Sequence, residues 1–361
     1  MTLKTLSLEN KHQELKAKMA PFAGFNMPLQ YSSVKEEVLA VRNGVGVFDV
    51  SHMGEFFVDG PDAIKFVDHI ITNDFNGAGS LKAVYSPLCR ENGTVIDDLI
   101  AYKLADEKVL ICVNASNIEK DWNWISAQTE GFNIQLTNKS EEYSLIAIQG
   151  PKTEEIMEKC ELLAQSNTDE FPYYSIREIE FQGHQLILAR TGYTGEDGFE
   201  VFCPHSFAPT LWEKLMELNV TPCGLAARDV LRIEVGYPLY GHEIHDEVTP
   251  LDSALKWTVK LNKENFIGKD ALESYQRKFR LIKIKLDKGI PREGYPIVLE
   301  NDEEIGKVTS GTMSVVLGQG VALAHVDPDK FSKETELFVN IRNKKYSAKF
   351  TTKPFVAGGH K

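Results

Sequence analysis

The segment Ser33–Asn43 carries its valines on one helical face, with polar residues on the other. Ser33 and Glu36 form a capping box at the start of this segment, and Gly44 follows it as a stop signal. The pattern therefore predicts an amphipathic helix over these residues.

An apolar run, a Gly-Pro pair and an amphipathic helix follow one another twice. The run GEFFVDG at residues 54–60 leads through Pro61 into a helix that extends to Ile71, and LIAIQGP, from Leu145, leads into a helix that ends at Cys160. We interpret these as two β-turn-α units that share one sheet, as in split βαβ folds. Gly-Pro before a helix is also common by chance, so coincidence is the alternative.

Further strands and helices are predicted around these units. Hairpin strands are expected in 85–104 and 108–114, and helices in 115–128, 206–218 and 224–235, the first of which buries Ile118, Trp122 and Ile125.

The pattern changes near residue 279. From Phe279, apolar residues alternate with lysines, and glycines then separate short runs, which is typical of a small β-barrel. We therefore place one region at 1–270, built of two intertwined α+β subdomains, and a barrel at 279–361, with the boundary in the stretch 270–278.

Length and net charge limit the number of domains and the classes of binding partner that we expect. A chain of 361 residues exceeds the usual size of one hydrophobic core, so two or three domains are expected. The net charge of −12 disfavours nucleic-acid binding. The N-terminus shows no signal or presequence character, and the longest uncharged run, 308–325, contains too many glycines and hydroxyls for a membrane span. We expect a cytoplasmic protein with no membrane or nucleic-acid partner.

The cysteines and histidines do not form a recognisable metal-binding pattern. The five cysteines include no C-x-x-C pair, which suits buried thiols in a reducing compartment. Only two of the histidines, His242 and His245, are close in sequence. We therefore expect no metal site.

The segment TGYTGEDGFE, Thr191–Glu200, combines glycines, hydroxyls, an aromatic ring and carboxylates between two strand-like runs. Glycine permits close approach to a ligand, Tyr193 can stack on a flat ring, and Glu200 can accept a pair of N–H donors. These features indicate a hairpin that binds a heterocycle. Taken alone, the segment also fits an ordinary glycine-rich turn.

Two adjacent acids, Asp97 and Asp98, interrupt an apolar strand. Strand alternation points them to opposite faces, so one is expected to face the interior. A carboxylate in a low-dielectric cleft is either paired or has a raised pKa, and both conditions favour catalytic or ligand-orienting work. A pair of solvated acids at an edge or turn is the alternative.

The helix that begins GLAARD carries Arg228 and Arg232 one turn apart, with Asp229 and Glu234 as possible partners. A surface ladder of ion pairs is one interpretation. The other is that Arg228 binds an anionic part of a ligand, while the following Tyr237 and Tyr240 form aromatic walls of the same cleft.

Several motifs together resemble the glycine-cleavage-system T protein, an aminomethyltransferase family. They occur in the expected order through almost the whole chain: MPLQY, FDVSHMGE, IDDL, AIQGP, TGYTGEDGFE, GLAARD, LYGHE, PLDSALKW, TSGTMSVVLG and KPFV.

The resemblance implies an α+β, three-domain, cloverleaf-like fold with a split βαβ (ferredoxin-like) part, an antiparallel β domain and a C-terminal β-barrel. It implies that tetrahydrofolate, as co-substrate, occupies a central channel and accepts the methylene group of S-aminomethyldihydrolipoyl H protein. Ammonia is released and 5,10-methylenetetrahydrofolate forms.

Residue roles follow from the same resemblance. Asp98 matches the catalytic aspartate, Glu200 the pterin-binding glutamate and Arg228 the arginine of the folate site. The channel-lining positions are matched by Met53, Tyr85, Asn114, Tyr193 and Tyr237.

The family also implies a monomer that docks the lipoylated H protein. Lys82 and Lys353 match lysines of that contact, whereas Gly79 stands where some members carry another lysine. One rival function is a folate-binding accessory protein for iron-sulfur cluster assembly, but the region YTGEDGFE lacks the cysteine of that group's motif. A demethylating dehydrogenase would need a flavin domain with G-x-G-x-x-G, which these 361 residues lack. A binding module without turnover is the third alternative.

Overall fold

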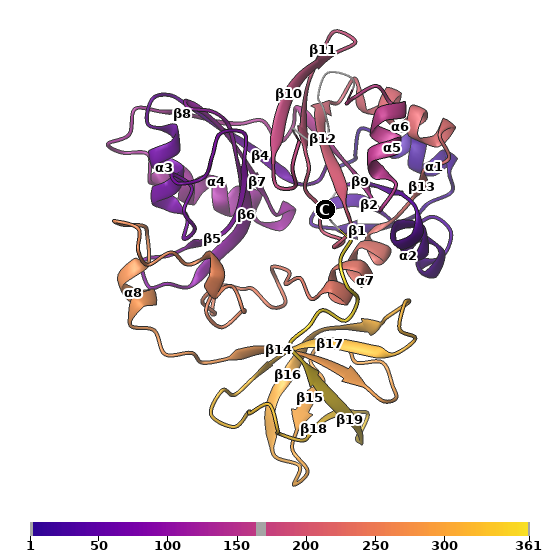
Figure 1. The fold of residues 1–361 in the computed structure, drawn as a ribbon, viewed down its shortest axis with the longest axis vertical. Helices are drawn as coiled ribbons and strands as arrows, with labels where there is room; N and C mark the ends of the chain where they lie inside the picture. The colour runs from indigo at the N-terminus through magenta and orange to yellow at the C-terminus, as the bar shows by residue number, and fades with distance from the viewer. Residues whose placement is uncertain (1–2, 164–170, 360–361) are drawn as a thin grey trace.

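The computed structural model describes residues 3–163 and 171–359. Its described parts form three lobes, which Figure 1 shows as an upper left, an upper right and a lower group of elements. This arrangement is the three-lobed, cloverleaf-like α+β fold that was predicted, with a closed barrel at the C-terminal end.

The first lobe is a five-stranded sheet with strand order β5-β6-β7-β4-β8. Its strands are β4 (Gly54–Asp59), β5 (Ala83–Cys89), β6 (Val95–Ala105), β7 (Lys108–Val113) and β8 (Gln135–Asn138). Helices α3 (Ala63–Ile70) and α4 (Ile118–Ala127) bury Phe66 and Ile125 in the core of this lobe. The predicted helix at 115–128 therefore exists, but its first turn, Ala115–Asn117, is a 3-10 helix, and Ile118 and Trp122 are only partly buried.

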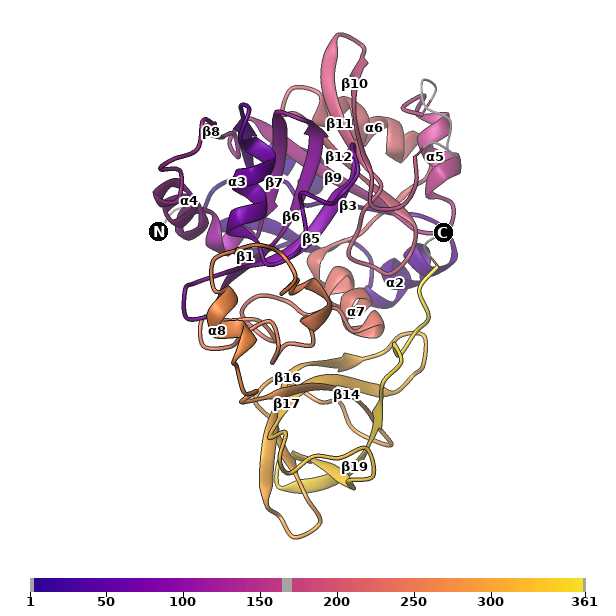
Figure 2. The ribbon, with the colours of Figure 1, turned by 60° about the vertical axis from the view of Figure 1, so that its left-hand side comes forward.

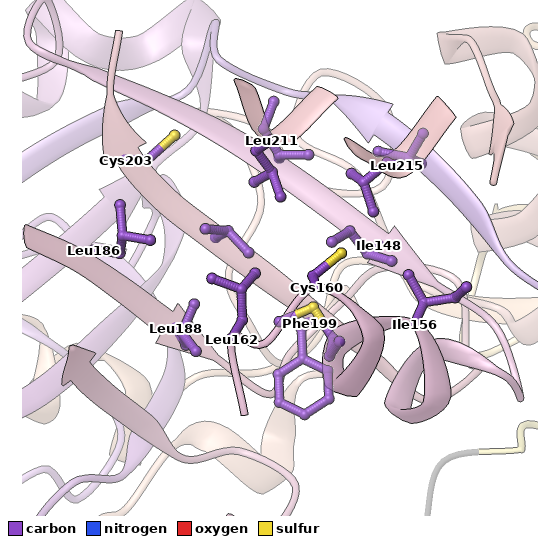
Figure 3. Close-up of a cluster of buried hydrophobic side chains, with 14 of the residues drawn as sticks. Ile148, Ile156, Cys160, Leu162, Leu186, Leu188, Phe199, Cys203, Leu211 and Leu215 are labelled. Carbon is purple, nitrogen blue, oxygen red and sulfur yellow. The ribbon is translucent and has the colours of Figure 1, made fainter. Parts of the chain in front are cut away.

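The second lobe is a six-stranded sheet with strand order β10-β11-β12-β9-β3-β13. Its strands are β3 (Gly46–Asp49), β9 (Tyr143–Gln149), β10 (Ile176–Phe181), β11 (His184–Ala189), β12 (Gly198–Pro204) and β13 (Thr221–Pro222). Apolar side chains of this sheet pack against α5 (Thr153–Lys159) and α6 (Ala208–Glu217), and Figure 3 shows Ile148 and Phe199 of the sheet in one cluster with Leu211 of α6. Cys160 and Cys203 lie in the same core, and all five cysteines are buried free thiols, as predicted.

Shorter elements connect and flank these two sheets. Near the N-terminus lie α1 (Glu9–Glu14), the hairpin of β1 (Lys18–Phe22) and β2 (Phe25–Gln30), and α2 (Val34–Asn43). Helix α7 (Leu225–Val235) packs against α2 and lies between the upper right lobe and the barrel in Figures 1 and 2. The 3-10 helix η3 (Lys256–Thr258) and α8 (Lys269–Glu273) precede the barrel.

The third lobe is a closed six-stranded barrel, as the alternating pattern after Phe279 predicted. Its strands are β14 (Arg280–Leu286), β15 (Pro296–Val298), β16 (Glu304–Met313), β17 (Gly320–Val326), β18 (Leu337–Ile341) and β19 (Lys344–Thr351). Ile282, Ile284 and Leu286 point into its core, because alternate residues of a strand face the same side.

The two Gly-Pro units are real β-turn-α units, but the prediction that they share one sheet was wrong. Strand β4 pairs with β7 and β8 in the first lobe. Strand β9 pairs with β3 and β12 in the second lobe. The two units thus belong to different sheets, since strand pairing is decided by segments far away in the sequence.

The predicted capping of α2 is present, because the Ser33 side chain accepts a hydrogen bond from the backbone N–H of Glu36 at 3.1 Å. We expect Ser33→Ala to lower the free energy of unfolding by about 1 kcal/mol, since this N–H then loses its partner. Denaturant unfolding checks this, with Ser33→Asp as the control that keeps an acceptor. Equal loss in both variants would contradict a capping role.

No described helix is long and apolar enough to cross a membrane.

Candidate functional site

A cavity of about 1400 Å³ lies where the three lobes meet. Its walls come from β5 and β6 of the first lobe, β12 of the second lobe, α7 and the barrel strand β16. The structure brings eight predicted site residues to this one cavity: Met53, Tyr85, Asp98, Asn114, Tyr193, Glu200, Arg228 and Tyr237. Segments separated by more than a hundred residues in the sequence therefore build a single site.

Asp98 presents its carboxyl group to the cavity from the middle of β6. The Tyr85 hydroxyl donates a hydrogen bond to Asp98 Oδ2 at 2.9 Å, and Asn114 Nδ2 donates one to Asp98 Oδ1 at 3.1 Å. Burial raises the pKa of Asp98 to about 7, and the charge of neighbouring Asp97 adds to this rise. A carboxyl with this pKa can hold or release a proton near neutral pH.

Asp97 points to the opposite face of β6, as strand alternation predicted, and is fully buried. It accepts hydrogen bonds from Asn114 Nδ2 at 2.9 Å, Asn117 Nδ2 at 2.7 Å and the backbone N–H of Asn114 at 3.1 Å. The alternative of a solvated pair of acids is therefore wrong.

The TGYTGEDGFE segment is anchored by the side chain of Gln149. Gln149 Nε2 donates to the Thr191 carbonyl at 3.0 Å, and its Oε1 accepts from the Thr194 hydroxyl at 2.8 Å. A Cβ atom at Gly198 would lie 2.2 Å from Gln149 Nε2, so only glycine allows this approach. The contact fixes the segment against β9 and directs Tyr193 and Glu200 into the cavity.

Tyr193 and Tyr237 form an aromatic wall, with ring centroids 5.8 Å apart and planes inclined by 30°. The Tyr193 hydroxyl donates to the carbonyl of Pro238, which holds the ring in place. Helix α7 ends at Gly236, whose φ of 84° is the left-handed conformation that glycine favours. The chain turns there and carries Tyr237 to the cavity.

Glu200 and Arg228 lie in the buried part of the cavity. The Glu200 side chain accepts a hydrogen bond from the Thr191 hydroxyl through Oε2 and has further lone pairs for a ligand's donors. The guanidinium of Arg228 lies 5.0 Å from the centre of the Tyr193 ring, and its buried Nη1 has no hydrogen-bond partner among the described residues. Burial lowers the pKa of Arg228, and the charge of Glu200 opposes this effect. An acceptor and a buried donor are thus both available to a ligand.

The interpretation of α7 as a surface ladder of ion pairs was wrong. Arg232 is buried, and it donates to Asp229 at 2.8 Å, to Glu243 at 3.2 Å and to Ser310 at 2.8 Å. Glu234 pairs with Arg42. Arg232 therefore ties α7 to the barrel, which leaves Arg228 as the arginine of this helix with an unpartnered buried donor.

The cavity is also lined by residues that were not predicted as site residues from the sequence. They are Tyr102, Tyr173 and Tyr174 from the upper lobes, Trp257 before the barrel, and Lys283 and Arg292 from the barrel. Trp257 is 58% exposed and stacks on Tyr85, with ring centroids 5.9 Å apart. The motif PLDSALKW pointed to this region, but only the fold shows that its tryptophan lies beside the partner of Asp98. Tyr240, predicted as a wall, also lines the cavity.

Lys82 and Lys353 do not line the cavity. Lys353 is exposed after β19, and Lys82 is partly exposed just before β5. Among the described residues, no cluster of three or more His, Cys, Asp or Glu side chains is arranged to hold a metal ion.

Two family models match the chain. The model of the GCVT N-terminal domain matches residues 8–263, and that of the glycine cleavage T-protein C-terminal barrel domain matches residues 277–357. The chain belongs to the glycine cleavage T-protein family.

Relatives of this T-protein family member are similar to it over nearly the full length of the chain. The chain is 45% identical to the aminomethyltransferase of Thermosipho melanesiensis over 365 residues, covering 99% of both chains. It is 47% identical to that of Thermotoga maritima over 331 residues, covering 90% of both. The crystal structure of the glycine cleavage system aminomethyltransferase T from Bartonella henselae superposes with a TM-score of 0.92, at 33% identity and 99% coverage of both chains. These findings confirm the predicted family and fold, and the chain is an aminomethyltransferase.

Proposed function

We propose that this protein transfers the methylene group of S-aminomethyldihydrolipoyl H protein to tetrahydrofolate, with release of ammonia, in the cytoplasm. The observation that carries the proposal is the single cavity that joins Asp98 to Tyr193, Glu200 and Arg228. Its volume of about 1400 Å³ exceeds the roughly 300–1,000 Å³ of common small-molecule pockets. That space is large enough for a folate together with the end of a carrier arm.

The residues of the cavity fit a folate. The rings of Tyr193 and Tyr237 offer flat apolar surfaces, and ionised Glu200 accepts paired N–H donors from the edge of the pterin. Arg228 Nη1 supplies a donor to an oxygen of the same ligand. Burial strengthens both interactions, because an unpaired polar group in this region is costly.

Asp98 acts at the reacting end of the site. Tetrahydrofolate supplies nitrogen 5 and nitrogen 10, which receive the carbon that leaves the lipoyl sulfur. The Asp98 carboxylate stabilises positive charge on this carbon and positions or relays the proton of nitrogen 10. Tyr85 and Asn114 hold the carboxylate in place through their hydrogen bonds.

The H protein docks outside the cavity in this proposal. Lys82 and Lys353 are accessible and positively charged, so they can contact an acidic partner surface. The aminomethyltransferase works as a monomer with this partner, and the reaction needs no metal.

The test of the proposed function is product formation. Aminomethylated, lipoylated H protein and tetrahydrofolate are incubated with and without the enzyme, and ammonia and 5,10-methylenetetrahydrofolate are measured. We expect equal amounts of the two products, dependent on the enzyme. Folate binding without either product would contradict the transfer and favour an accessory protein of iron-sulfur assembly.

The pH dependence of the reaction follows from Asp98. Because its pKa is about 7, and its ionised form is the active one, kcat/KM should fall as the pH decreases through about 7. The Tyr85 hydrogen bond stabilises the ionised form and lowers this pKa. Tyr85→Phe should therefore move the acid limb of the profile to higher pH, by about one unit.

The control for this prediction is Tyr346→Phe in the barrel, which should leave the pH profile unchanged. A Tyr85→Phe profile that coincides with the wild type, or moves to lower pH, would contradict the assignment of the limb to Asp98.

A further inference from the structure

The carboxyl group of Asp121 is buried behind the site without a donor. Asp121 lies on α4, its side chain is fully shielded from solvent, and neither oxygen has a hydrogen-bond donor among the described residues. An ionised carboxylate cannot remain in such surroundings without compensation, so the group must be neutral or share a proton.

The partner for this proton is Asp97. Helix α4 packs against β6, and the side chains of Asp121 and Asp97 interact there. Two carboxylates are acceptors only, so the contact is a hydrogen bond only when one of them is protonated. Asp97 already accepts from Asn114 and Asn117, whereas Asp121 accepts from no described group. The amide donors favour charge on Asp97, so the proton belongs on Asp121.

Electrostatics around Asp121 agree with this assignment. Burial raises the pKa of Asp121, and the charge of Asp97 raises it further. Lys120 is the opposing cation, but its Nζ donates to the Tyr240 hydroxyl at 2.6 Å. The titratable or charged groups that interact with Asp97 or Asp121 are Asp98 on β6, Cys112 on β7, Lys120 on α4 and Tyr240 in a loop. Tyr85 on β5 and Tyr193 in a loop interact with Asp98.

Asp97 is coupled to Asp98 through Asn114. Asn114 Nδ2 donates to Asp97 Oδ1 at 2.9 Å and to Asp98 Oδ1 at 3.1 Å. The negative charge of Asp97 therefore acts on the Asp98 carboxyl group at short range.

We propose that Asp121 is a positioning residue that stays protonated, donates its proton in a hydrogen bond to Asp97, and so keeps Asp97 ionised beside Asp98. The negative charge of Asp97 in turn keeps the affinity of Asp98 for a proton high enough for proton transfer at neutral pH. The first part concerns Asp121 and Asp97 alone, and the second part rests on the proposed role of Asp98.

The first experiment tests the proton without using activity. Infrared spectra of the wild type and of Asp121→Asn are compared at alkaline pH, above the pKa of Asp98. We expect the wild type to show a carboxylic-acid C=O band that is absent from Asp121→Asn. Identical spectra in that region, from two folded proteins, would show that Asp121 is ionised and would overturn the proposal.

The second experiment tests the effect on Asp98. Asp121→Leu removes the donor, so Asp97 takes up a proton, its charge is lost and the pKa of Asp98 falls. The acid limb of kcat/KM should then move to lower pH by roughly one unit. Asp121→Asn keeps an N–H donor and should keep the wild-type limb. A residue that only supports the fold would lower thermal stability in both variants without moving the limb, which would overturn this second part.

The two experiments also separate this inference from the proposed function. If Asp98→Asn kept full activity, the role of Asp98 would be wrong, but the infrared result would still decide the protonation of Asp121.

Discussion

Replacing Asp98 with asparagine is expected to lower turnover about 100-fold or more, the usual contribution of a general acid or base. Asparagine keeps the shape, and its oxygen can accept from Asn114 while its N–H donates to the Tyr85 oxygen, but it carries no charge and cannot relay a proton. Affinity for tetrahydrofolate should stay close to that of the wild type, because Asp98 lies at the reacting end and not at the proposed pterin contacts. Steady-state kinetics and calorimetry with folate measure the two effects separately.

A matched control is Asp106→Asn, which changes an exposed acid at the turn after β6. This variant should behave as the wild type in both assays. Wild-type turnover in Asp98→Asn would contradict the catalytic role of Asp98. A loss of folate affinity together with turnover would mean that Asp98 contributes to folate binding.

Glu200→Ala is expected to weaken tetrahydrofolate binding while the chemical step of bound substrate stays largely intact. The substitution removes the acceptor for buried N–H donors, a loss of roughly 1 to 3 kcal/mol, which corresponds to about 5- to 150-fold in Kd. Glu200→Gln should fall between the wild type and alanine, since an amide offers one acceptor and no charge.

Glu180→Ala on β10 is the control for general effects of losing a carboxylate from the same sheet, because Glu180 is exposed. Calorimetric titration of all four proteins gives the comparison. An unchanged Kd in Glu200→Ala would mean that the pterin binds elsewhere in the cavity.

The sequence predicted those features that depend on neighbouring residues. The helix cap at Ser33, the Gly-Pro units and the alternation that separates Asp97 from Asp98 are all set within a few positions of the chain. The pairing of β4 and β9 into different sheets was missed, because partners such as β7 and β12 lie far away in the sequence. Local patterns specify elements, whereas sheet membership is a property of the whole fold.

The same distinction holds for the site. Asp98, Glu200 and Arg228 could be proposed from the sequence because they lie in short motifs with unusual chemistry, and all three line the cavity. In the sequence, Asp121 resembles a surface acid of an amphipathic helix, and nothing in its neighbours reveals that it is buried without a hydrogen-bond donor. The sequence around Trp257 likewise does not reveal its contact with Tyr85, because the two residues are far apart in the chain. The burial of Asp121 and the ring contact of Trp257 both arise from long-range packing.

The central claim is that one cavity holds tetrahydrofolate with its pterin edge at Glu200 and its reacting nitrogens facing Asp98. A crystal structure of the protein with bound tetrahydrofolate tests this claim most directly. We predict hydrogen bonds from the pterin edge to the Glu200 carboxylate, and nitrogen 5 and nitrogen 10 directed toward Asp98. A folate bound outside this cavity, or with its pterin away from Glu200, would contradict the account.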